Sequence, residues 1–376
     1  MPQEKIWLSS PHMGGTEQKY VNEAFATNWI APLGPNVNNF EIDLETYLNE
    51  NVFVGALSSG TAALHLGLIM LDVKPGDEVI CQSMTFSASA NPIAYLGATP
   101  IFIDSEMDTW NMCPIALEEA IKDRLSKGKK PKAIIPVHLY GMPAKMDEIR
   151  VVANQYEIPI LEDSAEALGS SYKNQKCGTF GAISVLSFNG NKIITTSGGG
   201  AMVTHTKELK DKAVFLSTQA RDNAPHYQHS EIGYNYRMSN VCAGIGRGQM
   251  EVLDKHVNFR RANHQFYKGL FSTIADVEIL TEPSSDFYSN HWLSAIFLKS
   301  FEQREALRFA FETENIETRP LWKPMHLQPV FKDAPYYGKT VSENLFNKGL
   351  CLPSGSNLTK DEFLRIEKVI KDFFKL

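Results

Sequence analysis

The sequence predicts an α/β protein with a large domain, built as a mainly parallel mixed sheet between helices, and a smaller C-terminal α+β domain. Three observations predict this fold. From about Val52, short apolar runs alternate with helical patterns, which is typical of βα units wound into a parallel sheet. The apolar runs are continuous, as expected of strands that are covered on both faces. After about Leu253 the alternation stops and a different pattern begins.

The βα units follow one another from residue 52 to residue 163. Apolar runs predict the strands, and a period of 3.6 residues predicts the helices. Each pair of parallel strands needs a crossover connection, and the helices supply it. We expect strands at 52–57, 78–83, 99–104, 132–139 and 158–163, with helices at 61–71, 86–96, 116–125 and 145–156.

The C-terminal part has a pattern of its own. The run at 291–298 predicts a strand, and 304–315 predicts a helix. A last helix begins at a capping box formed by Thr359 and Glu362. Its apolar residues fall on one helical face, which we expect to be buried: Phe363, Ile366, Val369, Ile370 and Phe373. Because 376 residues exceed what one hydrophobic core usually serves, we expect a large domain at 1–252 and a small one at 253–376.

The composition is that of an ordinary globular protein, and it narrows the range of partners. Hydrophobic residues make up 43% of the chain and charged residues 21%. A net charge of −6 argues against nucleic-acid binding, but it does not exclude a basic pocket for a small anion. The five cysteines are scattered without a CxxC motif, which predicts neither a disulfide framework nor a metal site. The chain shows no signal-peptide pattern and no apolar stretch that could span a membrane, so we expect a cytoplasmic protein without membrane contacts.

Small polar residues follow the first predicted strand, at the edge of the sheet where ligands of α/β proteins bind. Ser58, Ser59, Gly60 and Thr61 form a turn that opens a helix. The free N–H groups and the dipole of a helix N-terminus favour an anion, so this turn suits a phosphate group. The alternative is a capped turn that binds no ligand.

Acidic residues follow the fifth predicted strand. Glu162 and Asp163 end this strand, and Glu166 comes shortly after. Buried carboxylates are costly unless they are paired. Glu162 or Asp163 could therefore ligate a metal, act as a base or pair with a cationic cofactor nitrogen; a helix N-cap is the alternative. Phe86, after the second strand, could cover a flat ring or lie in the core.

Lys192 follows a strand-like run and precedes the glycines at 198–200. A lysine at the edge of an apolar site can lose its proton and form a Schiff base. Pyridoxal phosphate combines an aldehyde, a flat ring, a ring nitrogen and a phosphate. These four groups would bind Lys192, Phe86, Asp163 and the turn at Gly60 and Thr61, respectively. Single lysines are usually surface groups, so the prediction of this cofactor rests on the whole set.

The order of these motifs resembles a known family. SSGTAAL, SMTFSASANPI, HLYGMPAKMDEI, LEDSAEALGS, SFNGNK and GYNYRMSN resemble the DegT/DnrJ/EryC1/StrS nucleotide-sugar aminotransferases, which are fold-type-I pyridoxal-phosphate enzymes. The resemblance covers nearly the whole chain. It implies that Lys192 forms the Schiff base and carries protons, and that Asp163 pairs with the protonated ring nitrogen.

The same resemblance implies the other cofactor contacts. It implies an active homodimer in which Asn235 reaches the phosphate in the neighbouring subunit. Glu166 stands where many relatives have His or Gln, so we expect only a supporting role for it near the ring hydroxyl. The remaining contacts expected with the cofactor are Ser59, Gly60, Thr61, Phe86, Ser187 and Asn189.

Further strings resemble one branch of the family. PHMGGTE, NWIAPLGPNVNNFE, STQARDN, ETRPLWKPMHLQPVF and CLPSG resemble the C4 transaminases of the UDP-N,N′-diacetylbacillosamine route. The resemblance implies that L-glutamate donates its amino group to UDP-2-acetamido-2,6-dideoxy-α-D-xylo-hex-4-ulose. It implies a groove for this substrate, in part from an N-terminal loop, lined by Asn28, Trp29, Ile30, Ala31, Arg319, Pro320, Leu321, Trp322 and His326.

Two of these residues have side chains that suit a UDP-sugar on chemical grounds. Arg319 suits a diphosphate, and Trp29 or Trp322 suits the face of a uracil ring. The alternative is that Arg319 forms a surface ion pair and Trp322 lies in the core.

Three other functions are compatible with parts of the sequence. Sugar 3-dehydratases resemble this family but have histidine in place of the Schiff-base lysine, so Lys192 argues against that activity. An aminotransferase could act on another sugar, such as a 3-keto dTDP sugar or the 4-keto sugar of the pseudaminic acid route. A non-catalytic ligand sensor on the same scaffold would need neither Lys192 nor Asp163.

Overall fold

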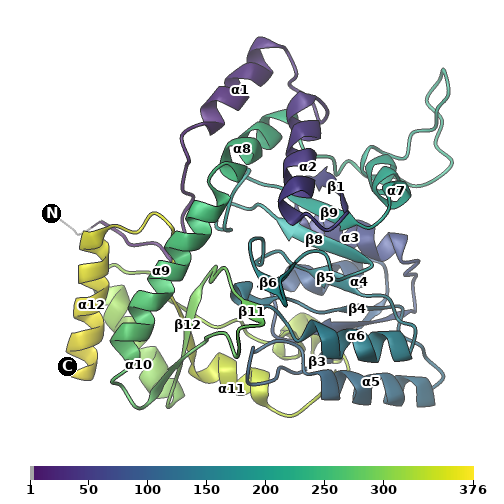
Figure 1. Ribbon diagram of the computed structural model, residues 1–376. Coiled ribbons are helices and arrows are strands. Elements are labelled where there is room, and N and C mark those ends of the chain that lie inside the picture. The colour runs from purple at the N-terminus through teal and green to yellow at the C-terminus, as the bar shows by residue number, and fades with distance from the viewer. Residues whose placement is uncertain (1–3) are drawn as a thin grey trace.

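The centre of the molecule is a mixed, mainly parallel sheet in the computed structural model, which describes residues 4–376 (Figure 1). One half has the strand order β1 (Phe53–Leu57), β9 (Gly200–Thr204), β8 (Ile183–Ser187), β5 (Leu161–Asp163). The other half has the strand order β4 (Ala133–Ile135), β2 (Glu78–Gln82), β3 (Thr99–Ile103), β14 (Tyr336–Tyr337). Parallel bridges from Ile134 to Ile160 and from Val137 to Asp163 join the halves. β9 is antiparallel to both its neighbours, whereas the other pairs are parallel. The predicted α/β fold is confirmed.

Helices cover both faces of this sheet, because successive residues of a strand point to opposite sides. Val79 and Cys81 of β2 belong to an apolar cluster with α3 (Gly60–Met70). Ile80 between them belongs to a second cluster with α5 (Pro114–Ser126) and α6 (Met146–Gln155). All three strand residues are fully buried, which explains why the strands are continuous apolar runs in the sequence.

The helices differ from the predicted ones where a proline fixes their start. The single helix expected at 86–96 is a 3₁₀ turn, η1 (Ser87–Ser89), followed by α4 (Asn91–Tyr95) with Pro92 in its first turn. Likewise α5 begins at Pro114 rather than at residue 116. Proline suits the first helical positions, because the N–H that it lacks would have no partner there. The break before α4 leaves Phe86 outside any helix and exposed.

The C-terminal part contains an antiparallel sheet with the order β10 (Val277–Ile279), β12 (Ser294–Leu298), β15 (Gly349–Leu352), β13 (Arg319–Pro320). α9 (Leu253–Phe271), α10 (Phe301–Thr313) and α12 (Lys360–Phe374) pack around it in one apolar cluster. The capping box predicted at Thr359 and Glu362 is present at the start of α12. The predicted domain division at residues 252 and 253 falls at the start of α9.

Several segments tie the two parts together. Ile6 bridges Ile316, β11 (Phe287–Tyr288) pairs with β6 (Ser171–Tyr172), and β14 extends the large sheet. The remaining elements are α1 (Glu17–Ala26), α2 (Pro35–Leu48), β7 (Gln175–Lys176), α7 (Lys207–Ser217), α8 (Asn240–Met250), α11 (Val341–Lys348), η2 (Leu139–Gly141), η3 (Met325–Leu327) and η4 (Pro329–Phe331). α1 and α2 pack on α8 at the β1 side of the large sheet (Figure 1). Within residues 4–376, no helix combines the length and the apolar character that crossing a membrane requires.

Candidate active site

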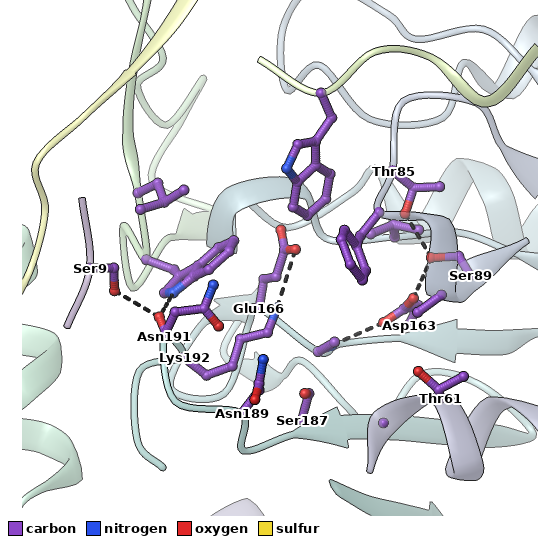
Figure 2. Close-up of a pocket in the computed structure, with 18 of the residues that line it drawn as sticks. Ser9, Thr61, Thr85, Ser89, Asp163, Glu166, Ser187, Asn189, Asn191 and Lys192 are labelled. Carbon is purple, nitrogen blue, oxygen red and sulfur yellow. Dashed lines mark hydrogen bonds and ion pairs between the residues drawn. The ribbon is translucent and has the colours of Figure 1, made fainter. Parts of the chain in front are cut away.

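A cavity of about 410 Å³ lies at the carboxyl ends of β1, β5 and β8 (Figure 2). Ligands of α/β sheets bind at this edge. The C-terminal part closes the cavity with the segments around Trp292 and Arg319. The cavity brings together most of the residues that the sequence predicts for the cofactor: Ser59, Gly60, Thr61, Phe86, Asp163, Glu166, Ser187, Asn189 and Lys192.

Lys192 lies in a turn that follows β8. Its amide N–H donates to the carbonyl of Asn189 over 3.0 Å. The Asn191 carbonyl accepts the indole N–H of Trp292 over 2.6 Å and the hydroxyl of Ser9 over 2.7 Å. The Lys192 ammonium nitrogen lies 4.2 Å from the centre of the Trp292 ring, and the lysine side chain is 12% exposed. Two distant segments therefore fix the turn, and the amine points into the cavity (Figure 2).

Asp163 faces the cavity from the end of β5. Its carboxylate accepts the hydroxyl of Ser89 over 2.6 Å and the amide N–H of Ala165 over 3.1 Å. The Ser89 hydroxyl is itself 2.7 Å from the Thr85 hydroxyl. Burial raises the pKa of the Asp163 carboxyl, although the hydrogen bond from Ser89 opposes the rise. Because its donors are neutral, this buried carboxylate suits a cationic group of a ligand.

Glu162 faces away from Asp163, since neighbouring residues of a strand point to opposite sides. It is fully buried and accepts the His138 ring N–H over 2.8 Å. Its other donors are two hydroxyls and three amides, from Ser164, Ser184, Gly178, Phe180 and Gly181. Burial alone would raise the pKa of Glu162, but the hydrogen bonds from His138 and the other donors lower it to about 2. A carboxylate with so many donors has a structural role, which leaves Asp163 as the acid that faces a ligand.

Glu166 lies beside Lys192. One carboxylate oxygen is 3.4 Å from the Lys192 ammonium nitrogen, and the other accepts the amide N–H of Tyr140 over 2.7 Å. Burial raises the pKa of Glu166 to about 7, although the charge of Lys192 and the Tyr140 amide oppose the rise. Glu166 therefore changes its protonation near neutral pH, next to the amine.

We expect Glu166→Gln to remove a pH dependence from the stability of the cofactor-free protein. The folded carboxyl, with a pKa of about 7, keeps a proton that the unfolded chain releases above about 4.5. Unfolding therefore releases a proton between these two values, so the free energy of unfolding falls as the pH rises through this window, by about 1–3 kcal/mol. Urea unfolding of both proteins at a series of pH values measures the effect. Two parallel stability curves would contradict the raised pKa.

The turn at the start of α3 can hold an anion. The Ser59 hydroxyl caps the helix by accepting the Ala62 amide N–H over 3.0 Å. At Gly60, a Cβ would lie 3.0 Å from the Cβ of Ser187 and crowd it, so the turn and β8 approach closely. Thr61 and Ser187 line the cavity beside the turn. The helix N-terminus and these hydroxyls fit the predicted phosphate site.

The mouth of the cavity is lined by Phe86, Arg319, Pro320 and Trp322. The rings of Phe86 and Trp322 lie 5.6 Å apart. The Arg319 side chain is 69% exposed and donates to the Glu317 carboxylate over 2.6 Å. Arg319 is therefore a surface ion pair and a cavity residue at once, and Trp322 is half-buried against the cavity rather than in the core.

Other residues predicted for the groove lie outside this cavity. Leu321 is buried in an apolar cluster with side chains from both parts of the molecule. His326 contacts the Ser83 hydroxyl over 2.7 Å and stacks on the ring of Tyr336. Leu321 stands between the lining residues Pro320 and Trp322, and His326 comes four positions after Trp322. The predicted contacts of these two residues with the substrate stay predictions.

The N-terminal loop and Asn235 also lie away from the cavity of their own chain. Asn28, Trp29 and Ile30 are exposed after α1, and Ala31 is half-buried. The side chain of Asn240 holds the loop by donating to the Trp29 carbonyl over 3.1 Å. Asn235 is exposed and bridges Thr218. The roles of these residues stay predictions.

The structure adds cavity residues that the sequence did not single out: Ser9, Thr85, Ser89, Asn191 and Trp292. Thr85 and Ser89 lie in the string SMTFSASANPI, whose hydroxyls after a strand could have indicated them. Ser9 and Trp292 come from distant segments, and no local pattern marks them.

Comparison with known proteins decides the family. A model of the DegT/DnrJ/EryC1/StrS aminotransferase family matches residues 11–371. The chain belongs to this family. EpsN of Bacillus subtilis (strain 168), whose name describes a pyridoxal phosphate-dependent aminotransferase, is 50% identical over 375 residues, which are 99% of this chain and 96% of EpsN. The GDP-perosamine synthase of Escherichia coli O157:H7 is 38% identical over 369 residues, or 98% of each chain. The crystal structure of a family aminotransferase from Brucella abortus superposes with a TM-score of 0.89 at 30% identity, over 95% of each chain.

This DegT/DnrJ/EryC1/StrS protein is therefore a pyridoxal-phosphate-dependent sugar aminotransferase of fold type I, as the sequence predicts. Its cavity fits the cofactor. The nearly buried amine of Lys192, the carboxylate of Asp163 and the anion site at the start of α3 face one space. These are the groups that an aldehyde, a ring nitrogen and a phosphate require.

Proposed function

We propose that this aminotransferase moves the amino group of L-glutamate to C4 of a UDP-linked 4-keto-6-deoxy-N-acetylhexosamine, giving the UDP-4-amino sugar. The acceptor is UDP-2-acetamido-2,6-dideoxy-α-D-xylo-hex-4-ulose. One observation carries the reaction type: Lys192, Asp163 and the start of α3 line the same cavity of about 410 Å³. The identity of the sugar rests on strings such as ETRPLWKPMH, which resemble the C4 transaminases of the bacillosamine route.

The geometry of the cavity supports a set of residues that would hold the cofactor. Gly60, Thr61 and Ser187 would hold its phosphate, Asp163 would pair with its ring nitrogen and Phe86 would lie by its ring. Ser59 and Asn189 would be further contacts with the cofactor. When bound, pyridoxal phosphate supplies an electron sink for the carbon that loses or gains a proton. The Asp163 carboxylate favours the protonated ring nitrogen, because an adjacent opposite charge stabilises the cation.

Lys192 is the proton carrier of both half-reactions in this proposal. It takes a proton from the Cα of glutamate, and later delivers one to C4 of the sugar, which fixes the configuration of the new amine. The turn held by Trp292 and Ser9 keeps the amine at one place in the cavity. A carboxylate oxygen of Glu166 lies 3.4 Å from the Lys192 amine nitrogen and helps to hold it.

The nucleotide sugar would enter at the mouth of the cavity. Arg319 offers a guanidinium for the diphosphate, and Trp322 offers a flat face for the uracil. The Glu317 carboxylate holds the Arg319 guanidinium at the mouth. Pro320 lines the wall between them. The other predicted groove residues are the exposed loop with Asn28, Trp29, Ile30 and Ala31, and the flanking Leu321 and His326.

The proposal includes a homodimer with shared active sites. Asn235 and the loop at 28–31 are exposed on their own chain and lie outside its cavity, so a neighbouring subunit is where they would act. Mixing inactive Lys192→Ala subunits with Asn235→Asp subunits should restore activity, since some sites then contain both intact residues. Equal mixing should return roughly a quarter of the wild-type rate if exchange is random. No recovered activity, despite subunit exchange shown by mass spectrometry, would contradict sharing.

A GDP-linked 4-keto sugar is the second candidate acceptor. The observation that favours it is the 38% identity to a GDP-perosamine synthase over 98% of both chains. A base-stacking tryptophan and an arginine on the diphosphate would serve a guanine nucleotide as well as a uracil one.

The product of the wild-type enzyme decides between these acceptors. The purified holoenzyme is incubated with L-glutamate and with UDP-, GDP- and dTDP-linked keto sugars, and each product is examined by NMR. An equatorial C4 amine on the gluco-configured UDP sugar supports the proposal. Amination at C3, or turnover of a GDP or dTDP sugar without turnover of the UDP sugar, would overturn it.

A further inference from the structure

Tyr140 has a backbone conformation that is rare for a bulky residue. Its φ is 55° and its ψ is 19°, and its side chain is almost fully buried within η2. The left-handed region is unfavourable for a residue with a Cβ. Such strain persists only where the surroundings fix it, and it concentrates at functional sites.

The backbone of Tyr140 is directed at the catalytic end of the cavity. Its amide N–H donates to one oxygen of Glu166 over 2.7 Å. The other oxygen of Glu166 lies 3.4 Å from the Lys192 ammonium nitrogen. The left-handed conformation therefore sets which way the Glu166 carboxylate turns.

The side chain of Tyr140 is directed at the mouth of the cavity. Its hydroxyl oxygen accepts the amide N–H of Trp322 over 2.9 Å, across 182 positions of the sequence. Its ring lies 5.2 Å from the Trp322 ring and 6.4 Å from the Trp292 ring. Trp322 lines the cavity next to Phe86, whereas the ring of Trp292 lies against the Lys192 amine. Tyr140 therefore contacts Glu166 and Trp292, which lie beside Lys192, and also Trp322 at the mouth of the cavity.

We propose that Tyr140 is a positioning residue with two separable actions. Its amide orients Glu166 toward Lys192, which serves both half-reactions. Its hydroxyl fixes the backbone of Trp322, and so the wall against which the nucleotide sugar lies, which serves only the second half-reaction. The second action rests on the proposed placement of the nucleotide sugar at Trp322.

Tyr140→Phe removes the hydroxyl and keeps the ring, the amide and the bond to Glu166. The Trp322 amide N–H then loses its buried partner, a loss of roughly tenfold in an equilibrium. We expect the KM for the keto-sugar nucleotide to rise about tenfold. The rate at which glutamate converts the bound cofactor, followed by absorbance in a single turnover, should change less than about twofold.

Tyr267→Phe is the matched control. Tyr267 is also fully buried, and its hydroxyl donates to the Pro353 carbonyl over 2.7 Å in the C-terminal core. This variant loses a comparable hydrogen bond away from the cavity, so both its KM and its single-turnover rate should equal those of the wild type. If Tyr140→Phe changes the KM no more than Tyr267→Phe does, or slows both half-reactions equally, the positioning role is wrong.

A substrate-free measurement separates this inference from the proposed acceptor. Hydrogen exchange of the holoenzyme, read at the peptide that contains Trp322, should be about tenfold faster in Tyr140→Phe and unchanged in Tyr267→Phe. The kinetic arm uses the UDP sugar, or the GDP sugar if the wild type aminates that one instead. Failure of the wild type on the UDP sugar counts against the proposed function, whereas unchanged exchange at Trp322 counts against the role of Tyr140.

Discussion

Lys192→Ala should fold normally and lose turnover by roughly 10⁴-fold or more, because the proposed reaction draws both its covalent link and its proton transfers from this amine. The fold should survive because the turn is held through the backbone carbonyls of Asn189 and Asn191, which alanine leaves in place. The side chain is only 12% exposed, so its loss opens space in the cavity without exposing the core. Turnover with glutamate and the accepted nucleotide sugar measures the effect.

Two further lysine variants show whether the amine acts through chemistry or through charge. Lys192→Arg keeps a cation that cannot release its proton, so it should be as inactive as the alanine variant. Lys127→Ala removes a lysine that is 55% exposed, pairs with Asp123 on α5 and does not line the cavity, so this variant should keep normal activity. Substantial turnover by Lys192→Arg would mean that the positive charge alone suffices, which would contradict the proton-carrying role.

The arrangement of the sheet could be predicted because burial on both faces leaves a direct trace in the sequence. Val79, Ile80 and Cys81 are consecutive and all fully buried, yet they belong to the clusters on opposite faces. No polar residue can stand at such a position without a cost. The starts of helices were less predictable from the sequence. Pro92 suits the first turn of α4, but it also interrupts the single helix that the apolar pattern predicts at 86–96.

The orientation of the two adjacent acids could not be predicted. Strand alternation requires Glu162 and Asp163 to face opposite ways, but it does not say which one faces the ligand. The donors to Glu162 include His138, Gly178 and Phe180, which come from two segments that are far apart in the sequence. Only their convergence in space shows that Glu162 is committed to the fold and that Asp163 is free to meet a cofactor.

Contacts between residues that are distant in the sequence also could not be predicted from it. Tyr140 lies in the string HLYGMPAKMDEI, but nothing local reveals its left-handed backbone or its bond to the Trp322 amide. Trp292 stands in a segment that predicts a strand, and its contact with the Lys192 turn depends on how the C-terminal part packs. For Asn235, the family resemblance implies a role in a partner subunit, which a single chain does not contain.

Asp163→Asn should keep the fold and lower turnover on the order of 10²–10³-fold, or about 3–4 kcal/mol of transition-state stabilisation. The amide can replace both existing hydrogen bonds, accepting from Ala165 and donating to Ser89, which can turn its own hydroxyl toward Thr85. What it cannot replace is the negative charge of Asp163, which in the proposed function holds a ring nitrogen of the cofactor protonated in a buried site. The loss should appear in both half-reactions, because both would use the ring of the cofactor as an electron sink.

Ser89→Ala is the matched variant for this charge. It removes one donor to Asp163 and keeps the carboxylate, so turnover should fall by only about three- to tenfold. Single-turnover rates with glutamate, and then with the nucleotide sugar, compare the two variants on each half-reaction. If Asp163→Asn stays within about threefold of the wild type, the hydrogen bonds rather than the charge are what the site needs, and Asp163 does not hold the ring nitrogen protonated. If Ser89→Ala loses as much as Asp163→Asn, the hydrogen bond that positions the carboxylate matters as much as its charge, because Ser89→Ala keeps the charge whereas Asp163→Asn can keep the hydrogen bond.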